Sequence, residues 1–232
     1  MTEPVILART DSSAPSRPAV DWAEREARLR GLPMRAVLYP PPDPIRAKMI
    51  VYGIPHGADA PGLSLGSRLP AAIRATDHPL VLVPNGHGAT HRSGSILLGT
   101  DARNPSDGTI DFAFDSARVR DALLHVVYAW SLPSCAAEWP FGVPEADRAT
   151  WEDHEVQLLA DVLGPWREKY PQVAVLEDVV LFTPAQALLH HAGSAALVVV
   201  GRKSGTEWGE AVRGVLHEAA CPVAVVPAWM TP

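Results

Sequence analysis

Short apolar runs recur along the whole chain and alternate with segments of helical periodicity. Continuous apolar runs of about four to eight residues, bounded by turn residues, are typical of strands buried on both faces of a sheet. Apolar residues three or four positions apart are typical of helices that pack on such a sheet. The runs predict strands at 5–9, 34–39, 49–53, 79–83, 96–101, 124–130, 173–182, 196–201 and 222–227.

Helical periodicity fills the stretches between most of these strands. Its alternation with the apolar runs predicts an α/β protein, with parallel strands and helices on both faces. The residues between 40 and 48 are too few for a crossover and a strand, so about one helix-strand-helix segment is missing there. The predicted helices are 18–30, 66–76, 107–121, 151–170, 183–195 and 209–219.

One pattern occurs twice, at residues 48–84 and 196–227. Each copy has an apolar run that ends in glycine, a Gly-rich loop, a short helical segment and a second apolar run that ends in Val-Pro. Each is preceded by a strand that ends near an aspartate, Asp11 in one and Asp101 in the other. Because backbone N–H groups at such a helix start can bind phosphate, the repeat predicts a duplicated unit of nucleotide-binding type.

The repeat divides the chain into two units of unequal length. We predict an abbreviated unit over residues 1–86, a linker at 87–95 and a complete unit over 96–232. The linker is rich in Gly, Ser, Asn and Thr and has no apolar period. Residues 131–150 are predicted to be a long loop, a kind of segment that is often functional.

Composition narrows the range of partners. The chain has 232 residues, of which 47% are hydrophobic and 20% are charged, and its formal net charge is −6. An acidic chain argues against a nucleic-acid or anionic-membrane partner. No apolar run approaches the roughly 20 residues that span a bilayer, and the N-terminus has no signal-peptide pattern. We therefore expect a cytoplasmic protein.

With these motifs the chain resembles the tandem universal stress proteins, with the first domain abbreviated. The resemblance covers roughly 5–84 and 96–227. It implies two Rossmann-like, adenine-nucleotide-alpha-hydrolase-like units, each a parallel sheet with helices on both faces. It also implies that the halves pack through the strands 79–83 and 222–226 as an intramolecular pseudo-dimer, with a homodimer as an alternative. Some members of this family bind ATP and others do not.

The family's ATP-binding pattern is Gly-x2-Gly-x9-Gly-Ser/Thr, a helix, and then Cys-Pro-Val-x-Val-Val. In the second half, residues 221–226 and Gly201 match it, but Gly205 follows Gly201 by four positions instead of three. Gly209 follows Gly201 by eight positions instead of thirteen, and Glu210 stands in place of the hydroxyl residue. The resemblance implies a nucleotide site formed by Asp101, Val127, Gly201, Arg202, Gly205 and Gly209.

The first half keeps other parts of the same pattern. Gly53 and Gly66 are thirteen positions apart, as the family pattern requires, and Ser67 follows Gly66. His56 stands where the second glycine is expected. The resemblance implies that Asp11, Gly53, Gly66 and Ser67 form the corresponding site in this half.

Glu210 bears directly on the affinity for a triphosphate. A carboxylate at the start of the last helix would lie where phosphate oxygens are expected. At an effective dielectric constant of about 20, like charges about 4 Å apart repel by roughly 4 kcal/mol. The alternative is that Glu210 only stabilises the start of its helix. Arg202 and Lys203 are candidates to offset the repulsion, or are solvated loop charges. We expect either no cofactor or weak binding of ATP or AMP, and no micromolar affinity for ATP in this half.

No residue set predicts catalysis or a metal site. The chain has no G-x-S-x-G motif and no Ser, His and Asp set with the spacing of a triad. His190 and His191 are adjacent, so they do not share a helical face and are not expected to bind a metal jointly. We therefore expect a regulatory, stress-response binding protein and not an enzyme. An ATP-binding member with slow ATP hydrolysis is the alternative.

Three tryptophans allow two interpretations. Trp139, Trp151 and Trp208 are candidates to line a pocket beside the loop 131–150. Packing in the core or at an interface is the interpretation that we favour.

Overall fold

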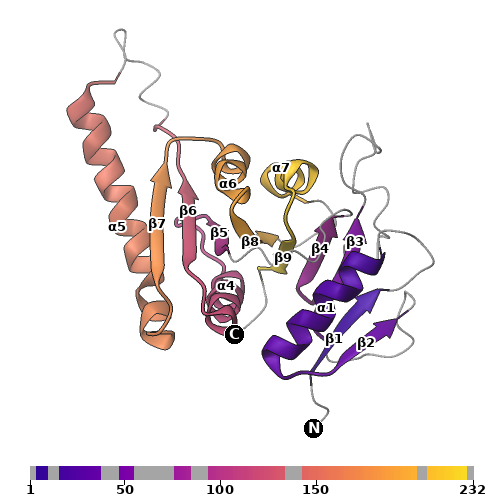
Figure 1. Cartoon of the computed structure of the whole chain (residues 1–232). Helices are drawn as coiled ribbons and strands as arrows, with labels where there is room; N and C mark the ends of the chain where they lie inside the picture. Colours follow the sequence, from indigo (N-terminus) through magenta and orange to yellow (C-terminus); the bar gives the residue numbers. More distant parts are fainter. Residues whose placement is uncertain are drawn as a thin grey trace.

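The computed structural model describes residues 4–9, 16–37, 47–54, 76–84, 94–133, 143–202 and 208–228. These residues form nine strands in one sheet and five helices (Figure 1). The strands are β1 (Val5–Arg9), β2 (Met34–Val37), β3 (Ala47–Ile54), β4 (Leu80–Pro84), β5 (Ser95–Thr100), β6 (Leu124–Ala129), β7 (Val175–Val180), β8 (Ala195–Arg202) and β9 (Val223–Pro227). The helices are α1 (Ser16–Arg30), α4 (Asp107–Arg120), α5 (Glu145–Lys169), α6 (Pro184–Ala192) and α7 (Glu210–Glu218).

The strands lie in the order β2-β1-β3-β4-β9-β8-β5-β6-β7. All neighbours are parallel except β4 and β9, which pair antiparallel, with Leu80 opposite Val225 and Leu82 opposite Val223. The α/β class and the packing of the two final strands are thus confirmed. Where we expected two parallel sheets, this antiparallel pair joins them into one continuous sheet.

The inner strands of the sheet are largely buried on both faces, which explains their continuous apolar runs, whereas the edge strands β2 and β7 are partly exposed. Along β9, Ala224 and Val226 belong to the core layer that contains α1, α4 and α5. Val223 and Val225 belong to the opposite layer, which contains α6 and α7. Figure 1 shows α5 at the β7 end of the sheet and β2 at the other end.

Side chains at the helix ends explain where α4 and α6 begin. The Ser106 hydroxyl accepts a hydrogen bond from the Thr109 N–H at 3.3 Å, and Thr183 caps α6 in the same way. Such caps satisfy N–H groups that have no partner within the helix. Asp121 ends α4 in the left-handed conformation, with φ of 49°.

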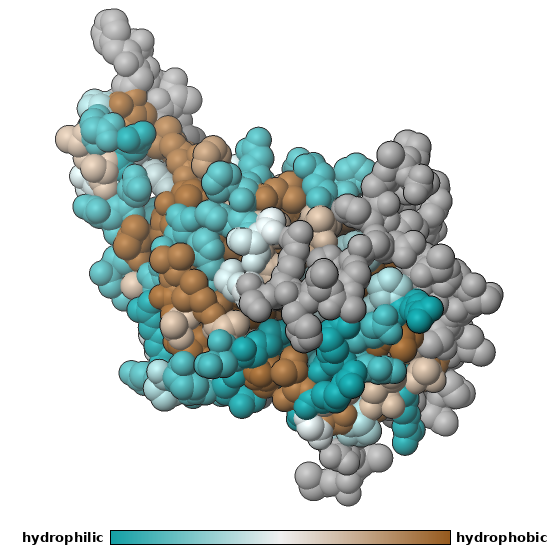
Figure 2. All heavy atoms as spheres, in the orientation of Figure 1, coloured by the Kyte–Doolittle hydropathy of each residue, from teal (hydrophilic) through white to brown (hydrophobic). Residues whose placement is uncertain are grey.

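Helix α5 begins earlier than the sequence predicted. Residues 145–150 are helical, so the predicted loop 131–150 is wrong at its C-terminal end. The Arg148 guanidinium pairs with Glu145 at 2.7 Å, and the Thr150 hydroxyl donates to the Ala146 carbonyl at 2.8 Å. These polar local bonds stabilise a turn that lacks an apolar period. Figure 2 shows brown and teal atoms side by side along α5.

A buried ionic network joins α1 to α4. Arg30 pairs with Glu26 at 2.5 Å, and it also pairs with Asp115. Arg30 donates to the Ser116 hydroxyl at 3.2 Å, and Arg120 pairs with Glu26. The side chains of Glu26 and Arg30 are no more than 4% exposed. Removal of either charge would therefore leave the other buried with fewer opposite charges near it. The network therefore connects two helices that are distant in the sequence. The end of α1 at Arg30 and the N-cap of α4 at Ser106 are 76 positions apart.

Some predictions fall on residues outside the described ranges. They concern the helix at 66–76 except for Thr76, most of the linker, and residues 134–142 of the loop. In the part of the chain that the structure describes, no helix is long and apolar enough to span a membrane.

Candidate functional site

A cavity of about 800 Å³ lies at the carboxyl ends of β5, β6 and β8, beside the start of α7. The chain leaves β5 for β6 on one side and later forms β8 on the other, so β5 and β8 flank a topological switch point. Open α/β sheets bind ligands at this place. The residues that line the cavity are Gly99, Thr100, Asp101, Arg103, Val127, Tyr128, Ala129, Trp130, Ser131, Pro184, Leu188, Val200, Gly201, Arg202, Trp208, Gly209, Glu210, Ala211, Val212 and Arg213.

Five of the residues predicted for the second half line this cavity together: Asp101, Val127, Gly201, Arg202 and Gly209. They come from three strand ends and one helix start, which lie up to 108 residues apart. Their proximity follows from the parallel order of the strands, because the carboxyl ends of parallel strands meet at one edge.

The other predicted residues are placed differently. Gly53 lies in β3, opposite Val83 of β4, and does not line this cavity. The remaining four lie outside the described residues: Asp11, Gly66, Ser67 and Gly205.

Asp101 is exposed and follows β5 directly. Its carboxylate oxygen Oδ1 accepts a hydrogen bond from the Arg103 N–H at 3.1 Å, which closes a turn. The carboxylate therefore both shapes the loop and stands at the rim of the cavity.

Gly201 is required by packing whether or not a ligand binds. A Cβ atom there would lie 2.9 Å from Oγ1 of Thr109 on α4. That hydroxyl is itself held 2.8 Å from the Ser106 hydroxyl, so it cannot move away freely. The close approach of helix and strand thus explains one glycine of the motif.

The structure contradicts one of the two expectations for Arg202 and leaves the other, that it offsets the repulsion by Glu210, untested. Arg202 is only 3% exposed, so it is not a solvated loop charge. Its guanidinium group donates a hydrogen bond to the backbone carbonyl of Thr76, in the first half of the chain. Burial lowers the pKa of Arg202, and Asp77 acts in the opposite direction. Arg202 therefore connects the two halves. The other candidate cation, Lys203, lies outside the described residues.

The start of α7 presents backbone donors at the cavity. Gly209 is the N-cap and supplies no side-chain acceptor, and Glu210, Ala211 and Val212 of the first turn line the cavity. The first N–H groups of a helix have no partner within it and carry positive potential. This is a suitable place for an anionic group. Glu210 is exposed in the same turn.

Two tryptophans that line the cavity have buried indole nitrogens without an acceptor among the described atoms. They are Trp130 and Trp208, which are 6% and 7% exposed. A buried donor without a partner costs about 1 to 3 kcal/mol, so each of these indoles lowers the stability of the described structure. Trp208 was among the tryptophans considered from the sequence. Trp130 was missed, although it ends an apolar run next to the loop.

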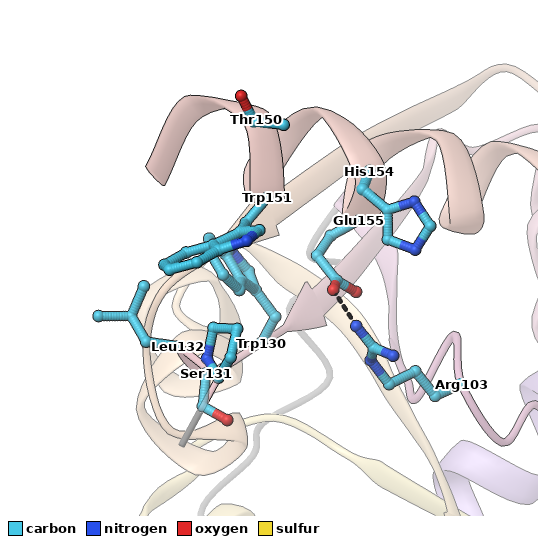
Figure 3. A pocket seen from close by; sticks show the side chains of 9 residues that line it. Arg103, Trp130, Ser131, Leu132, Thr150, Trp151, His154 and Glu155 are labelled. Carbon is cyan, nitrogen blue, oxygen red and sulfur yellow. Dashed lines mark hydrogen bonds and ion pairs between the residues drawn. The ribbon is translucent and has the colours of Figure 1, made fainter. Parts of the chain in front are cut away.

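A second cavity of about 750 Å³ adjoins the first and shares Arg103, Trp130 and Ser131 with it (Figure 3). Glu155 of α5 pairs there with Arg103 and accepts a hydrogen bond from the Tyr128 hydroxyl at 2.8 Å. Burial, together with Glu155, raises the pKa of Tyr128 to about 12, so the phenol stays neutral. No sequence pattern indicates this contact, because Tyr128 lies on β6, Glu155 on α5 and Arg103 in the turn after β5.

Trp151 lines this second cavity, and Figure 3 shows its ring beside Trp130. The pocket interpretation of the tryptophans therefore holds for Trp151 and Trp208. Both also pack against hydrophobic residues, as we expected of them. Trp139 lies outside the described residues.

The sheet order and the cavity at the switch point define an open α/β protein of the Rossmann-like class. Residues 93–227 match the Universal stress protein family, which is more than half of the chain. The chain therefore belongs to the universal stress protein family.

Two relatives are proteins of Mycobacterium tuberculosis. Universal stress protein Rv2623 is 30% identical over 183 residues, which cover 78% of this chain and 60% of the relative. Universal stress protein Rv2005c is 32% identical over 187 residues, which cover 77% of this chain and 61% of the relative. The chain thus spans about three fifths of the length of the curated relatives that it matches.

One solved structure is similar over nearly the whole chain. It is the crystal structure of a universal stress protein from Archaeoglobus fulgidus DSM 4304, with a TM-score of 0.65. The match covers 98% of this chain and 100% of that one. The sequences are 12% identical, so the likeness establishes the fold alone.

Proposed function

We propose that this universal stress protein acts as a regulatory binding protein in a stress response, that it binds adenine nucleotides only weakly, and that it does not turn them over. The observation that carries the proposal is the cavity at the switch point, where the start of α7 has no side-chain cap and presents its first backbone N–H groups. Its volume of about 800 Å³ is within the usual range for small-molecule sites.

The same features support weak binding. Glu210 stands in the first turn of α7, and Arg202 is directed at Thr76. Glu210 is exposed, so water screens it, and its repulsion of a phosphate about 4 Å away is nearer to 1 kcal/mol than to 4. Repulsion of that size weakens binding about fivefold and does not abolish it. The shortened spacing from Gly201 to Gly209 reduces the number of backbone donors further.

Binding without turnover is supported by the groups that line the cavity. Catalysis of hydrolysis needs a group that attacks or one that moves a proton. The aliphatic hydroxyls that line it belong to Thr100 and Ser131, and in the described structure neither is hydrogen-bonded to a carboxylate or an imidazole. Asp101 has one oxygen occupied by the Arg103 N–H.

We further propose that the first half of the chain is an abbreviated copy of the second. The order β2-β1-β3-β4 parallels β6-β5-β8-β9, and both β1 and β5 precede a helix on the same face. Counterparts of α5, β7 and α6 would fall between β2 and β3, where the chain is too short to hold them. The pairing of β4 with β9 then makes an intramolecular pseudo-dimer, which we expect to act in the cytoplasm.

The proposal is tested by two assays on one preparation of the full chain. Denaturing the purified protein and assaying the supernatant should release at most a small fraction of one adenine nucleotide per chain. Incubation with ATP should release no phosphate above the buffer control. Steady release that Asp101→Asn abolishes would make the protein an enzyme and would favour the alternative, slow ATP hydrolysis. A full equivalent of tightly held nucleotide would refute weak binding.

A further inference from the structure

Side chains of histidine and aspartate from three elements meet on the face of the sheet that carries α6. His125 lies on β6, Asp178 on the edge strand β7, and His191 in the last turn of α6. In the register of the two strands Val127 is opposite Asp178, so His125 and Asp178 are diagonal neighbours on one face. These residues lie 53 and 13 positions apart, and no sequence motif connects them.

Their donor atoms are close enough to share one ion. Oδ2 of Asp178 lies 3.0 Å from Nε2 of His191 and 3.5 Å from Nε2 of His125, and all three atoms are within 4.8 Å of one another. Two ligands of a tetrahedral zinc ion, at bonds of about 2.0 to 2.2 Å, are about 3.3 to 3.5 Å apart. Only small side-chain movements separate the cluster from that geometry.

His125 supplies a second, independent observation. Its Nε2 atom is buried and makes no well-formed hydrogen bond within the described residues, and its printed contact is with Oδ2 of Asp178 at 3.5 Å. Buried polar atoms are nearly always paired, so an orphaned imidazole nitrogen directed at a carboxylate needs a partner. Burial lowers the pKa of His125, and His191 lowers it further while Asp178 opposes the change.

The geometry points to a mononuclear site for a divalent cation of the Zn²⁺ class, with His125, Asp178 and His191 as its protein ligands. Imidazole nitrogens with one carboxylate suit zinc, and three protein ligands leave a position for water. The side chains of Asp178 and His191 are 31% and 26% exposed, so solvent can reach the site. A bound ion would fasten α6 to the edge of the sheet.

This site differs from the pair His190 and His191, which we did not expect to bind a metal jointly. The two rings are edge to face with centroids 4.9 Å apart, and His190 is exposed. Of these two neighbouring histidines, His191 is the one that pairs with Asp178 in the described structure. The site is also separate from the cavity at the switch point, so its test is independent of the proposed function.

The test is a titration of the metal-free full chain, without a polyhistidine tag, with ZnCl₂ by isothermal calorimetry. We expect one Zn²⁺ per chain with a micromolar or lower dissociation constant. Asp178→Asn and His191→Gln should each weaken binding by about 100-fold or more, because loss of a ligand should exceed the 10- to 100-fold cost of losing an outer partner. His217→Gln, on the exposed side of α7, is the matched control and should bind as the parent does.

Two further measurements keep the test decisive. Circular dichroism and thermal unfolding establish that each variant is folded, and Zn²⁺ should raise the melting temperature of the parent but not of Asp178→Asn. Co²⁺ in place of Zn²⁺ should give visible absorption bands that the same substitution removes. The inference is overturned if the parent binds no Zn²⁺, or if Asp178→Asn and His191→Gln bind it as tightly as the parent.

Discussion

Residues 4–84 and 94–228 each contribute a set of parallel strands to the same sheet. The two sets differ in the number of helices that the structure describes beside them. The described part of the first set has four strands and one helix, and the second has five strands and four helices. Both cavities described above are lined by residues of the second set. In the described structure, α6 and α7 line the cavity at the switch point and α5 lines the second cavity.

The first set nonetheless contributes to the stability of the second. β4 protects β9 from being an exposed edge, and Arg30 of α1 reaches Asp115 and Ser116 of α4. Arg202 reaches back from the cavity to Thr76. These contacts show that the first set of strands, together with α1 and Thr76, packs against and supports the second set.

The largest expected effect comes from breaking the ionic contact between the halves. Glu26→Gln should lower the free energy of unfolding by about 3 to 5 kcal/mol, because it removes the carboxylate that pairs with Arg120 and leaves Arg30 with Asp115 as its printed acidic partner. Glu24→Gln is the matched control, since its pair with Arg28 at 3.6 Å is exposed and should be worth less than about 1 kcal/mol. Urea denaturation of both variants measures the difference. Equal stabilities would mean that the network does not join the halves.

The second largest expected effect tests whether a glycine of the motif is needed for packing. Gly201→Ala should cost about 1 to 3 kcal/mol, because its new Cβ would lie 2.9 Å from the Thr109 hydroxyl oxygen. Gly209→Ala should cost less than about 1 kcal/mol, because nothing lies within 4 Å of a Cβ there. Thermal unfolding of the two variants compares them directly. A larger loss at Gly209 would contradict the packing explanation.

A pH dependence follows from Asp115. Burial acts to raise its pKa, but Arg30, Arg118 and Lys48 outweigh burial and hold the pKa below its usual range. A carboxyl with a lowered pKa in the folded state stabilises the protein above its unfolded pKa of about 4 and loses that contribution as the pH falls further. The stability difference between the parent and Asp115→Asn should therefore be largest above about pH 4 and shrink below it. Urea midpoints across this range test the sign.

These contrasts also indicate what the sequence could predict. Strand positions were predicted within a few residues, because burial on both faces imposes continuous apolar runs. The turn at 145–150 was missed, because its helix is stabilised by polar pairs such as Glu145 with Arg148 and has no apolar face. Local patterns report burial well and report surface helices poorly.

The sequence predicts those site residues that follow a parallel strand or begin a helix, because these positions meet at one edge of the sheet. Asp101, Gly201 and Gly209 meet because each ends a strand or begins a helix at the same edge. The direction of Arg202 was not predictable, since its partner Thr76 lies 126 residues away. The same holds for His125 and Asp178, whose proximity depends on the register of β6 and β7.

The smallest expected effect concerns the charge at the start of α7. Glu210→Ser should tighten ATP binding about fivefold, because removal of an exposed like charge about 4 Å away is worth roughly 1 kcal/mol. If the shortened loop is the main defect, the affinity should not change. Arg213→Ser, in the same helix and at the same cavity, is the control and should weaken binding. Calorimetric titration with ATP distinguishes these outcomes.

The most direct test of the central claim, that the second half holds a weak nucleotide site at its switch point, is an ATP titration of the full chain by calorimetry. We predict one site with a dissociation constant above about 10 μM, equivalent to less than about 7 kcal/mol of binding free energy. Asp101→Ala should weaken it severalfold or more, while Asp101→Asn, which keeps an acceptor for the Arg103 N–H, should weaken it less. Submicromolar binding, or binding that Asp101→Ala leaves unchanged, would contradict the account.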